Sequence, residues 1–208
     1  MSRRPGCSAQ TLVVAESTKR WATADDTYYD HPGVVITASA GDGGYGVKYP
    51  AASPYVTSVG GTTLIASSTA RGWSETVWSG TGSGCSPYES SPGWQPTTTN
   101  CTTRTVADTA ADAYPSTGVV VYDSYGQSGW LVFGGTSVAS PIIASVYALA
   151  HNALRVTAGS LYGPSLNRVT SGTNARRCGT YLCNAADSLS SGYNGPTGNG
   201  TPIGTSGF

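Results

Sequence analysis

Apolar and β-branched residues gather in a few short runs of this 208-residue chain, and Gly, Ser and Thr separate the runs. Residues 33–40 form a continuous run, which is typical of a strand buried on both faces of a parallel sheet. A second short strand is expected at residues 55–59. Residues 118–123 and 129–133 are expected to pair across a polar turn. Together these runs predict an α/β fold with a mostly parallel sheet.

A helix is expected where an apolar stretch follows the sequence Gly134–Gly135–Thr136–Ser137. We place it at about residues 137–151, with Pro141 near its start. Unpaired N–H groups and the positive end of the helix dipole would then favour an anion beside Ser137. A nucleophilic serine needs such surroundings. The alternative is that Ser137 is only the N-cap of the helix, a position that serines commonly occupy.

Asp42 directly follows the buried run 33–40, inside the glycine-rich sequence 41–46. Open α/β sheets bind ligands beyond the carboxyl ends of their strands, so a functional acid is expected here. The alternative is an ordinary turn, because Asp-Gly is a common turn pair. A phosphate-binding loop is not expected, because no Lys-Ser/Thr follows the glycines.

Composition narrows the range of partners and compartments. Only 11% of residues are charged and the formal net charge is zero, which argues against nucleic acid or an anionic membrane as a partner. No apolar run approaches the roughly 20 residues of a membrane span, and residues 1–7 lack the pattern of a signal peptide.

The five cysteines favour an oxidising compartment. We expect local bridges Cys85–Cys101 and Cys178–Cys183, with Cys7 left over; the alternative is that all five are reduced. Residues 1–20 show no clean periodicity beyond a short strand at 11–15. A short helix is expected at residues 21–29.

Three segments resemble, in order along the chain, the sedolisin family of serine-carboxyl peptidases: residues 38–62, residues 104–123 and residues 134–137. The resemblance implies a subtilisin-like fold with helices on both faces of the sheet. It also implies an extracellular endopeptidase that cleaves peptides or unfolded proteins in acid. Residues 21–208 would be the carboxyl-terminal part of the catalytic domain, and residues 1–20 are unmatched. A true subtilisin would need a catalytic histidine in a His-Gly-Thr-type motif and an Asn in the oxyanion position. The two histidines do not fit, because His31 lies in a turn and His151 at a helix end.

The resemblance implies Ser137 as the nucleophile and Asp42 as the acid of the oxyanion hole. An aspartate must be protonated to donate a hydrogen bond, which favours acid conditions. The family's base is a Glu-x-x-x-Asp pair on an upstream helix, and Glu16, Glu75 and Glu89 all lack that spacing. We therefore expect a chain truncated on its N-terminal side and inactive by itself.

Two alternatives to a peptidase stay open. One is a peptide-binding or remnant module that uses the same fold without catalysis. The other is a surface-structural protein, suggested only by the Ser/Gly/Thr-rich, weakly charged composition. The sequence gives no indication of the oligomeric state.

The resemblance also implies a Ca²⁺ site near the C-terminus. The matching positions offer backbone carbonyls of Val169, Ser190 and Gly192 and the side chain of Asn194. Arg168 stands where the family has an acid, and a cation there opposes a hard divalent ion. A weak or lost calcium site is therefore expected.

Overall fold

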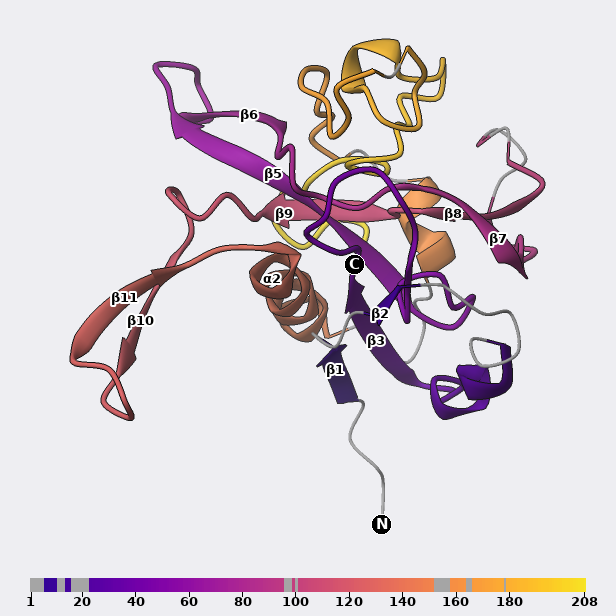
Figure 1. Ribbon diagram of the computed structural model, residues 1–208, viewed down its shortest axis with the longest axis horizontal. Helices are drawn as coiled ribbons and strands as arrows, with labels where there is room; N and C mark the ends of the chain where they lie inside the picture. The colour runs from indigo at the N-terminus through magenta and orange to yellow at the C-terminus, as the bar shows by residue number, and fades with distance from the viewer. Residues whose placement is uncertain are drawn as a thin grey trace.

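A sheet of five strands, most of them parallel, forms the centre of the computed structural model (Figure 1). The structure describes residues 6–10, 14–15, 23–95, 99, 101–151, 158–163, 166–177 and 179–208. Parallel pairing joins β1 (Gly6–Gln10) to β3 (Val34–Ser39) and β3 to β5 (Thr57–Ala66). β9 (Thr109–Asp112) is also parallel to β5. β6 (Trp73–Val77) pairs antiparallel with the last residues of β5. The predicted α/β fold with a mostly parallel sheet is confirmed.

β3 is buried on both faces, as the continuous apolar run predicted. Val35 belongs to a core cluster beneath helix α2 (Thr136–Ala150), whereas Ile36 and Ala38 belong to a second cluster on the opposite face. Successive side chains of a strand point to opposite faces, so a strand covered on both sides has few polar positions.

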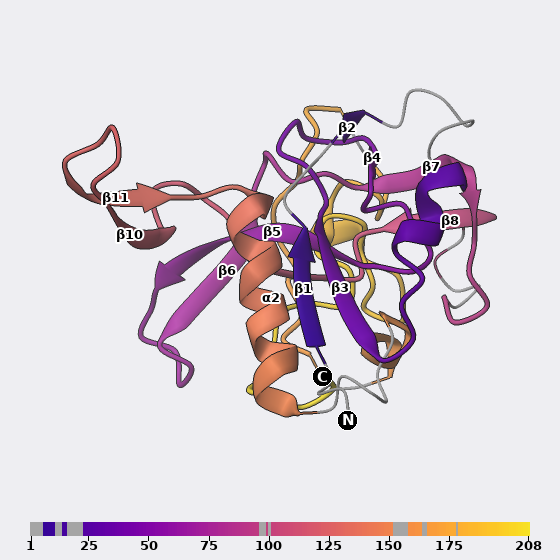
Figure 2. The same ribbon diagram turned by 90° about the horizontal axis from the view of Figure 1, so that it is seen from below.

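Helix α2 covers the first face and lies alongside β1 and β3 (Figure 2). Its residues Ile143 and Tyr147 are fully buried in the core. A polar contact fixes the helix on the sheet, because the Thr37 hydroxyl donates to the Ser140 carbonyl over 3.1 Å. The helix begins one residue earlier than predicted, which places Pro141 inside it rather than at its start.

The second face of the sheet is covered, within the described residues, largely by loops and short strands. Its cluster joins Ile36 and Ala38 to Ala51, Val56 and Val106, and the Tyr29 ring packs against it. Ala51 and Val56 come from the segment that follows β4, and Val106 comes from β8. The remaining elements are β2 (Val14–Ala15), β4 (Lys48–Tyr49), β7 (Gly84–Ser90), β8 (Thr103–Val106), β10 (Val119–Asp123), β11 (Gly129–Phe133), η1 (Asp26–Tyr28), η3 (Ala158–Tyr162) and η4 (Ala185–Asp187).

Several local predictions need correction. Residues 6–10 form β1, although no regular structure was expected there. The strand predicted at 55–59 begins at Thr57 and continues to Ala66, because β9 and β6 pair with its second half. Of the strand predicted at 11–15, Val14 and Ala15 form β2, and residues 11–13 lie outside the described residues.

The predicted pairing of residues 118–123 with residues 129–133 is confirmed by the β10–β11 hairpin, which projects away from the sheet (Figure 1). The predicted short helix at 21–29 is helical at residues 23–25 and continues as η1, while residues 21–22 lie outside the described part. The Cys85–Cys101 disulfide is present. Cys178 lies outside the described residues, so its bridge to Cys183 stays a prediction.

A fully buried ion pair ties β8 to the rest of the domain. The guanidinium of Arg104 donates to both carboxylate oxygens of Asp108, over 2.7 and 2.5 Å. Asp108 also accepts hydrogen bonds from the Ser58 backbone N–H and the Tyr162 hydroxyl. Because bidentate Arg–carboxylate pairs are geometrically specific, this contact fixes the relative positions of β8, β5 and η3.

Candidate active site at the carboxyl end of β3

Asp42 lies just beyond β3, where the chain turns away from the sheet. Its Oδ1 atom accepts two hydrogen bonds from Thr136, one from the backbone N–H over 2.8 Å and one from the hydroxyl over 2.6 Å. Thr136 is the first residue of α2, and Ser137 follows it. The structure therefore brings Asp42 to the helix terminus that carries Ser137, although Asp42 and Thr136 are 94 positions apart in the sequence.

Thr136 links Asp42, the end of β3 and α2. Its hydroxyl accepts the Gly41 backbone N–H over 3.1 Å while donating to Asp42, and its carbonyl accepts the Ser39 hydroxyl over 3.0 Å. Thr136 is fully buried, so these contacts are shielded from water. Sequence reasoning missed Thr136, and its only signal was its position next to Ser137.

The N-cap of α2 is Gly135, not Ser137, so the interpretation of Ser137 as a helix cap is wrong. Gly135 has a φ of +94°, and a Cβ at this position would lie 2.6 Å from Asp42 Oδ2. Only glycine accepts both this backbone conformation and the close approach of the carboxylate. Ser137 is half-buried, and its hydroxyl has no hydrogen-bond partner among the described residues.

A second loop holds the Asp42 loop in place. The Gly82 N–H donates to the Gly41 carbonyl over 2.8 Å, and the Gly44 N–H donates to the Gly80 carbonyl over 2.8 Å. A cavity of about 150 Å³ lies between the two loops; its lining residues are Tyr45, Gly46, Val47, Ser83, Gly84, Cys85 and Pro87. The loop that bears Asp42 is therefore braced beside a small recess.

The two glutamates in the described residues are held by contacts of their own. Glu75 pairs with Arg71 at 2.5 Å and accepts hydrogen bonds from Thr62, Asn167 and Thr201. Both oxygens of Glu75 are therefore occupied, which does not suit a general base. Glu16 lies outside the described residues.

Glu89 is buried in β7, where the Thr23 hydroxyl donates to it over 3.4 Å. It also hydrogen-bonds to the carboxyl group of Asp26. The pKa of Asp26 is raised mainly by burial, an effect that hydrogen bonds from Ser53, Tyr49 and Glu89 partly oppose. This carboxyl pair therefore belongs to the contact between η1 and β7.

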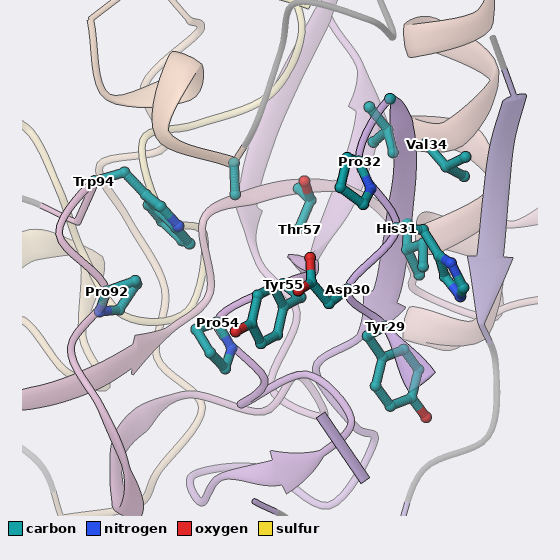
Figure 3. Close-up of a pocket in the computed structure, with 14 residues that line it drawn as sticks. Tyr29, Asp30, His31, Pro32, Val34, Pro54, Tyr55, Thr57, Pro92 and Trp94 are labelled. Atoms are coloured by element: carbon teal, nitrogen blue, oxygen red, sulfur yellow. The ribbon is translucent and has the colours of Figure 1, made fainter. Parts of the chain in front are cut away.

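A cavity of about 470 Å³ lies at the opposite end of β3 from Asp42. Figure 3 shows the residues that line it. It opens beside the start of β3, around Val34, and the start of β5, at Thr57. Figure 3 shows Tyr55 and Trp94 on its walls and the Asp30 carboxylate directed inward. Because ligands of open α/β sheets bind beyond the carboxyl ends of the strands, this cavity is not the candidate active site.

The residues expected at the calcium site do come together, but their contacts do not suit a metal ion. Arg168 donates from Nη2 to the Ser191 carbonyl over 2.9 Å, and Asn194 donates from Nδ2 to the Val169 carbonyl over 3.1 Å. Ca²⁺ takes six to eight oxygen ligands, usually including carboxylates. Of the expected ligands, the Val169 carbonyl is already hydrogen-bonded, and a cation stands where the family has an acid. No group of three His, Cys, Asp or Glu side chains in the described residues could hold a metal.

Comparison with solved structures fits this geometry. The structure of Pseudomonas sedolisin, a serine-carboxyl proteinase complexed with two molecules of pseudo-iodotyrostatin, superposes with a TM-score of 0.77 and 31% identity. The superposition covers 94% of this chain and 62% of that one. In sequence, sedolisin from Pseudomonas sp. (strain 101) is 38% identical over 178 residues, covering 76% of this chain and 29% of that protein. The chain is a homologue of the sedolisin family.

Two further relatives of the sedolisin homologue agree with this assignment. Xanthomonalisin from Xanthomonas sp. (strain T-22) is 39% identical over 161 residues, and kumamolisin from Bacillus sp. (strain MN-32) is 36% identical over 206 residues. The matches cover 62% and 83% of the homologue but only 19% and 35% of those proteins. The homologue therefore spans about a third or less of the length of its curated relatives. No protein-family model matches it.

The subtilisin-like fold predicted for the sedolisin homologue is confirmed. A more distant structure, the S41 psychrophilic protease, shares the fold alone, with 19% identity and a TM-score of 0.50. Among the described residues, no helix has the length and apolar character needed to cross a membrane.

Proposed function

We propose that the chain provides the nucleophile and the oxyanion-hole acid of a serine-carboxyl peptidase that cleaves unfolded proteins in acid. Ser137 is the nucleophile and Asp42 is the acid. The observation that carries the proposal is the position of Asp42 at the helix terminus that bears Ser137, with Thr136 hydrogen-bonded to Asp42 Oδ1. The homology to serine-carboxyl peptidases supports the same assignment.

The contacts of Asp42 leave a role for each of its oxygens. Oδ1 is occupied by Thr136, whereas Oδ2 lies against the α-carbon of Gly135. A proton on Oδ2 would be available to the oxyanion that forms when Ser137 Oγ attacks a peptide carbonyl. The N-terminus of α2 adds the positive end of its dipole to the same place. Donors placed where charge develops are worth much more in such a site than in water.

The proton released by Ser137 needs a base, and residues 1–208 contain no Glu-x-x-x-Asp pair. Removing a triad member commonly costs several orders of magnitude in turnover, with residual catalysis from the oxyanion hole and binding. Residues 1–208 by themselves are therefore expected to cleave peptides slowly, if at all. The Cys85–Cys101 disulfide supports an extracellular location.

A peptide aldehyde tests the site without requiring turnover. A bond forms between Ser137 Oγ and the aldehyde carbon, and the hydroxyl proton moves to the aldehyde oxygen. We expect tighter binding at about pH 4 than at about pH 7, because only a protonated Asp42 donates to that oxygen. Ser137→Ala should weaken binding at least tenfold, while Ser145→Ala, at an exposed serine of the same helix, should not. Asp42→Asn keeps a donor at every pH and should remove most of the pH contrast.

The second candidate function is a peptide-binding module without catalysis. The recess between the loop that bears Asp42 and the loop around Ser83 would suit it. Under this reading the Ser137→Ala variant binds the aldehyde and the matching peptide alcohol as tightly as the parent chain does. Acid-dependent hydrolysis of an unfolded protein that disappears in Ser137→Ala would exclude this second candidate and would point to an unrecognised carboxylate base.

A further inference from the structure

The side chain of Arg168 lies over the turn that contains Gly192. Its Nη2 atom donates to the Ser191 carbonyl over 2.9 Å. A Cβ at Gly192 would lie 2.4 Å from both the Cζ and the Nε atoms of Arg168, and Gly192 has a φ of +87°. The guanidinium therefore occupies the space above the α-carbon of Gly192 and hydrogen-bonds to the carbonyl of the preceding residue, Ser191.

Asn194 completes the same arrangement from the buried side. It is only 1% exposed. Its Nδ2 donates to the Val169 carbonyl over 3.1 Å, and its Oδ1 accepts both the N–H and the hydroxyl of Thr197, over 3.0 and 2.8 Å. The side-chain oxygen of Asn194 thus already accepts two hydrogen bonds, and the Val169 carbonyl already accepts one.

The turn held in this way is part of the domain core. The Tyr193 hydroxyl donates to the Ala107 carbonyl over 2.9 Å, and the Ala107 N–H donates to the Gly195 carbonyl over 2.8 Å. Ala107 lies between Arg104 and Asp108, the buried ion pair. A displacement of the turn would therefore shift Ala107 and disturb the ion pair between Arg104 and Asp108.

We propose that Arg168 is a built-in cation that takes the place of a bound divalent ion, so that the fold of this C-terminal turn does not depend on calcium. A divalent ion needs carboxylates and free carbonyl oxygens. Here the charge comes from a guanidinium, which offers five N–H donors in a fixed plane. Asn194 supplies the neutral contact on the buried side. The role is structural and independent of the proposed function.

Thermal unfolding tests the proposal. For the parent chain we expect the same Tm in excess EGTA and in millimolar CaCl₂. Arg168→Met keeps the apolar stem but loses the charge and the bond to Ser191, so its Tm should fall and calcium should not restore it. The matched control is Arg176→Met, at an exposed arginine of the same C-terminal segment, whose Tm should stay at the parent value.

A gain-of-function variant gives the converse result. Arg168→Asp combined with Asn194→Asp restores two carboxylates, and its Tm should rise on adding calcium. A parent Tm that rises with calcium or falls in EGTA overturns the proposal. So does an Arg168→Met variant that is no less stable than Arg176→Met, or a double variant that folds but ignores calcium. If the variants fail to fold, calorimetric titration of the parent chain with CaCl₂ decides alone, because measurable binding excludes the built-in cation.

Discussion

The Oδ1 atom of Asp42 accepts both the backbone N–H and the hydroxyl of Thr136. This double contact satisfies one of the unpaired N–H groups at the start of α2 from a distant part of the chain. It also fixes which carboxylate oxygen remains for other partners. The position of Asp42 is therefore determined by the helix that carries Ser137, and changes at the helix start should move the carboxylate.

Replacing Thr136 by valine tests this dependence. The two side chains have nearly the same shape, but valine leaves the Gly41 N–H without its acceptor and Asp42 without one of its donors. We expect the free energy of unfolding to fall by about 1–3 kcal/mol, the usual cost of an unsatisfied buried polar group. Urea unfolding measures it. Thr136→Ser keeps the hydroxyl and should lose clearly less; equal losses would mean that the methyl group matters more than the bond.

Gly135→Ala should be harmful for two separate reasons. Its backbone has a φ of +94°, and the added Cβ would lie 2.6 Å from Asp42 Oδ2. A non-glycine residue in a sparsely populated backbone region costs about 1–3 kcal/mol. Binding of the peptide aldehyde should weaken as well, because Asp42 must shift. Gly43→Ala in the Asp42 loop is the control, since its Cβ would meet nothing within 4 Å; similar effects at both positions would contradict the explanation.

The buried carboxyl group of Asp26 should make stability depend on pH. Asp26 is 7% exposed, and burial is the main reason why its pKa is raised in the folded state. The protonated form is thus favoured by folding, so its contribution is complete below the unfolded pKa of about 3.9 and is lost as pH rises through the higher folded pKa. Asp26→Asn, which cannot ionise, should lack this decline.

Urea unfolding of parent and Asp26→Asn chains from about pH 3 to pH 7 measures the difference. The stability of the variant relative to the parent should increase with pH. Asp30→Asn, at an exposed carboxyl group, serves as the control and should track the parent. A difference between Asp26→Asn and the parent that stays constant with pH would show that Asp26 titrates alike in the folded and unfolded states.

The two arginine ion pairs should differ strongly in their importance. Arg104 is fully buried against Asp108, and Arg104→Met leaves that carboxylate buried without its cation, which typically costs about 3–5 kcal/mol. Arg71 is exposed and pairs with Glu75, which keeps three other donors. Arg71→Met should cost at most about 1 kcal/mol. Urea midpoints of the two variants give the comparison, and comparable losses would argue against burial as the deciding factor.

The features that the sequence predicted well are those with local signals. The continuous run 33–40 predicted a strand covered on both sides, and the step from two glycines to an apolar stretch predicted the start of α2 to within one residue. The roles of Asp42 and Ser137 stay predictions, but their positions at a strand end and at a helix start follow directly from these two elements. Their proximity then follows from the topology of the sheet.

The features that the sequence did not predict depend on partners far along the chain. Residues 6–10 are Gly-Cys-Ser-Ala-Gln, which have little intrinsic preference for a strand, and only their pairing with β3 makes them one. Thr136 looks like any hydroxyl residue near a helix start until Asp42 is placed beside it. Likewise, Arg168 could be recognised as an obstacle to calcium, but its hydrogen bond to Ser191 across the turn could not.

The burial of β3 on both faces has a consequence for how the domain unfolds. Val35 and Ile36 are neighbours on one strand, yet they belong to different apolar clusters. Both clusters pack against β3, so neither can lose its contacts with this strand while the other keeps them. The two apolar clusters should therefore unfold together in one cooperative transition. The backbone amides of β3 should accordingly be among the last to exchange with deuterium, and at a rate that reports global rather than local opening.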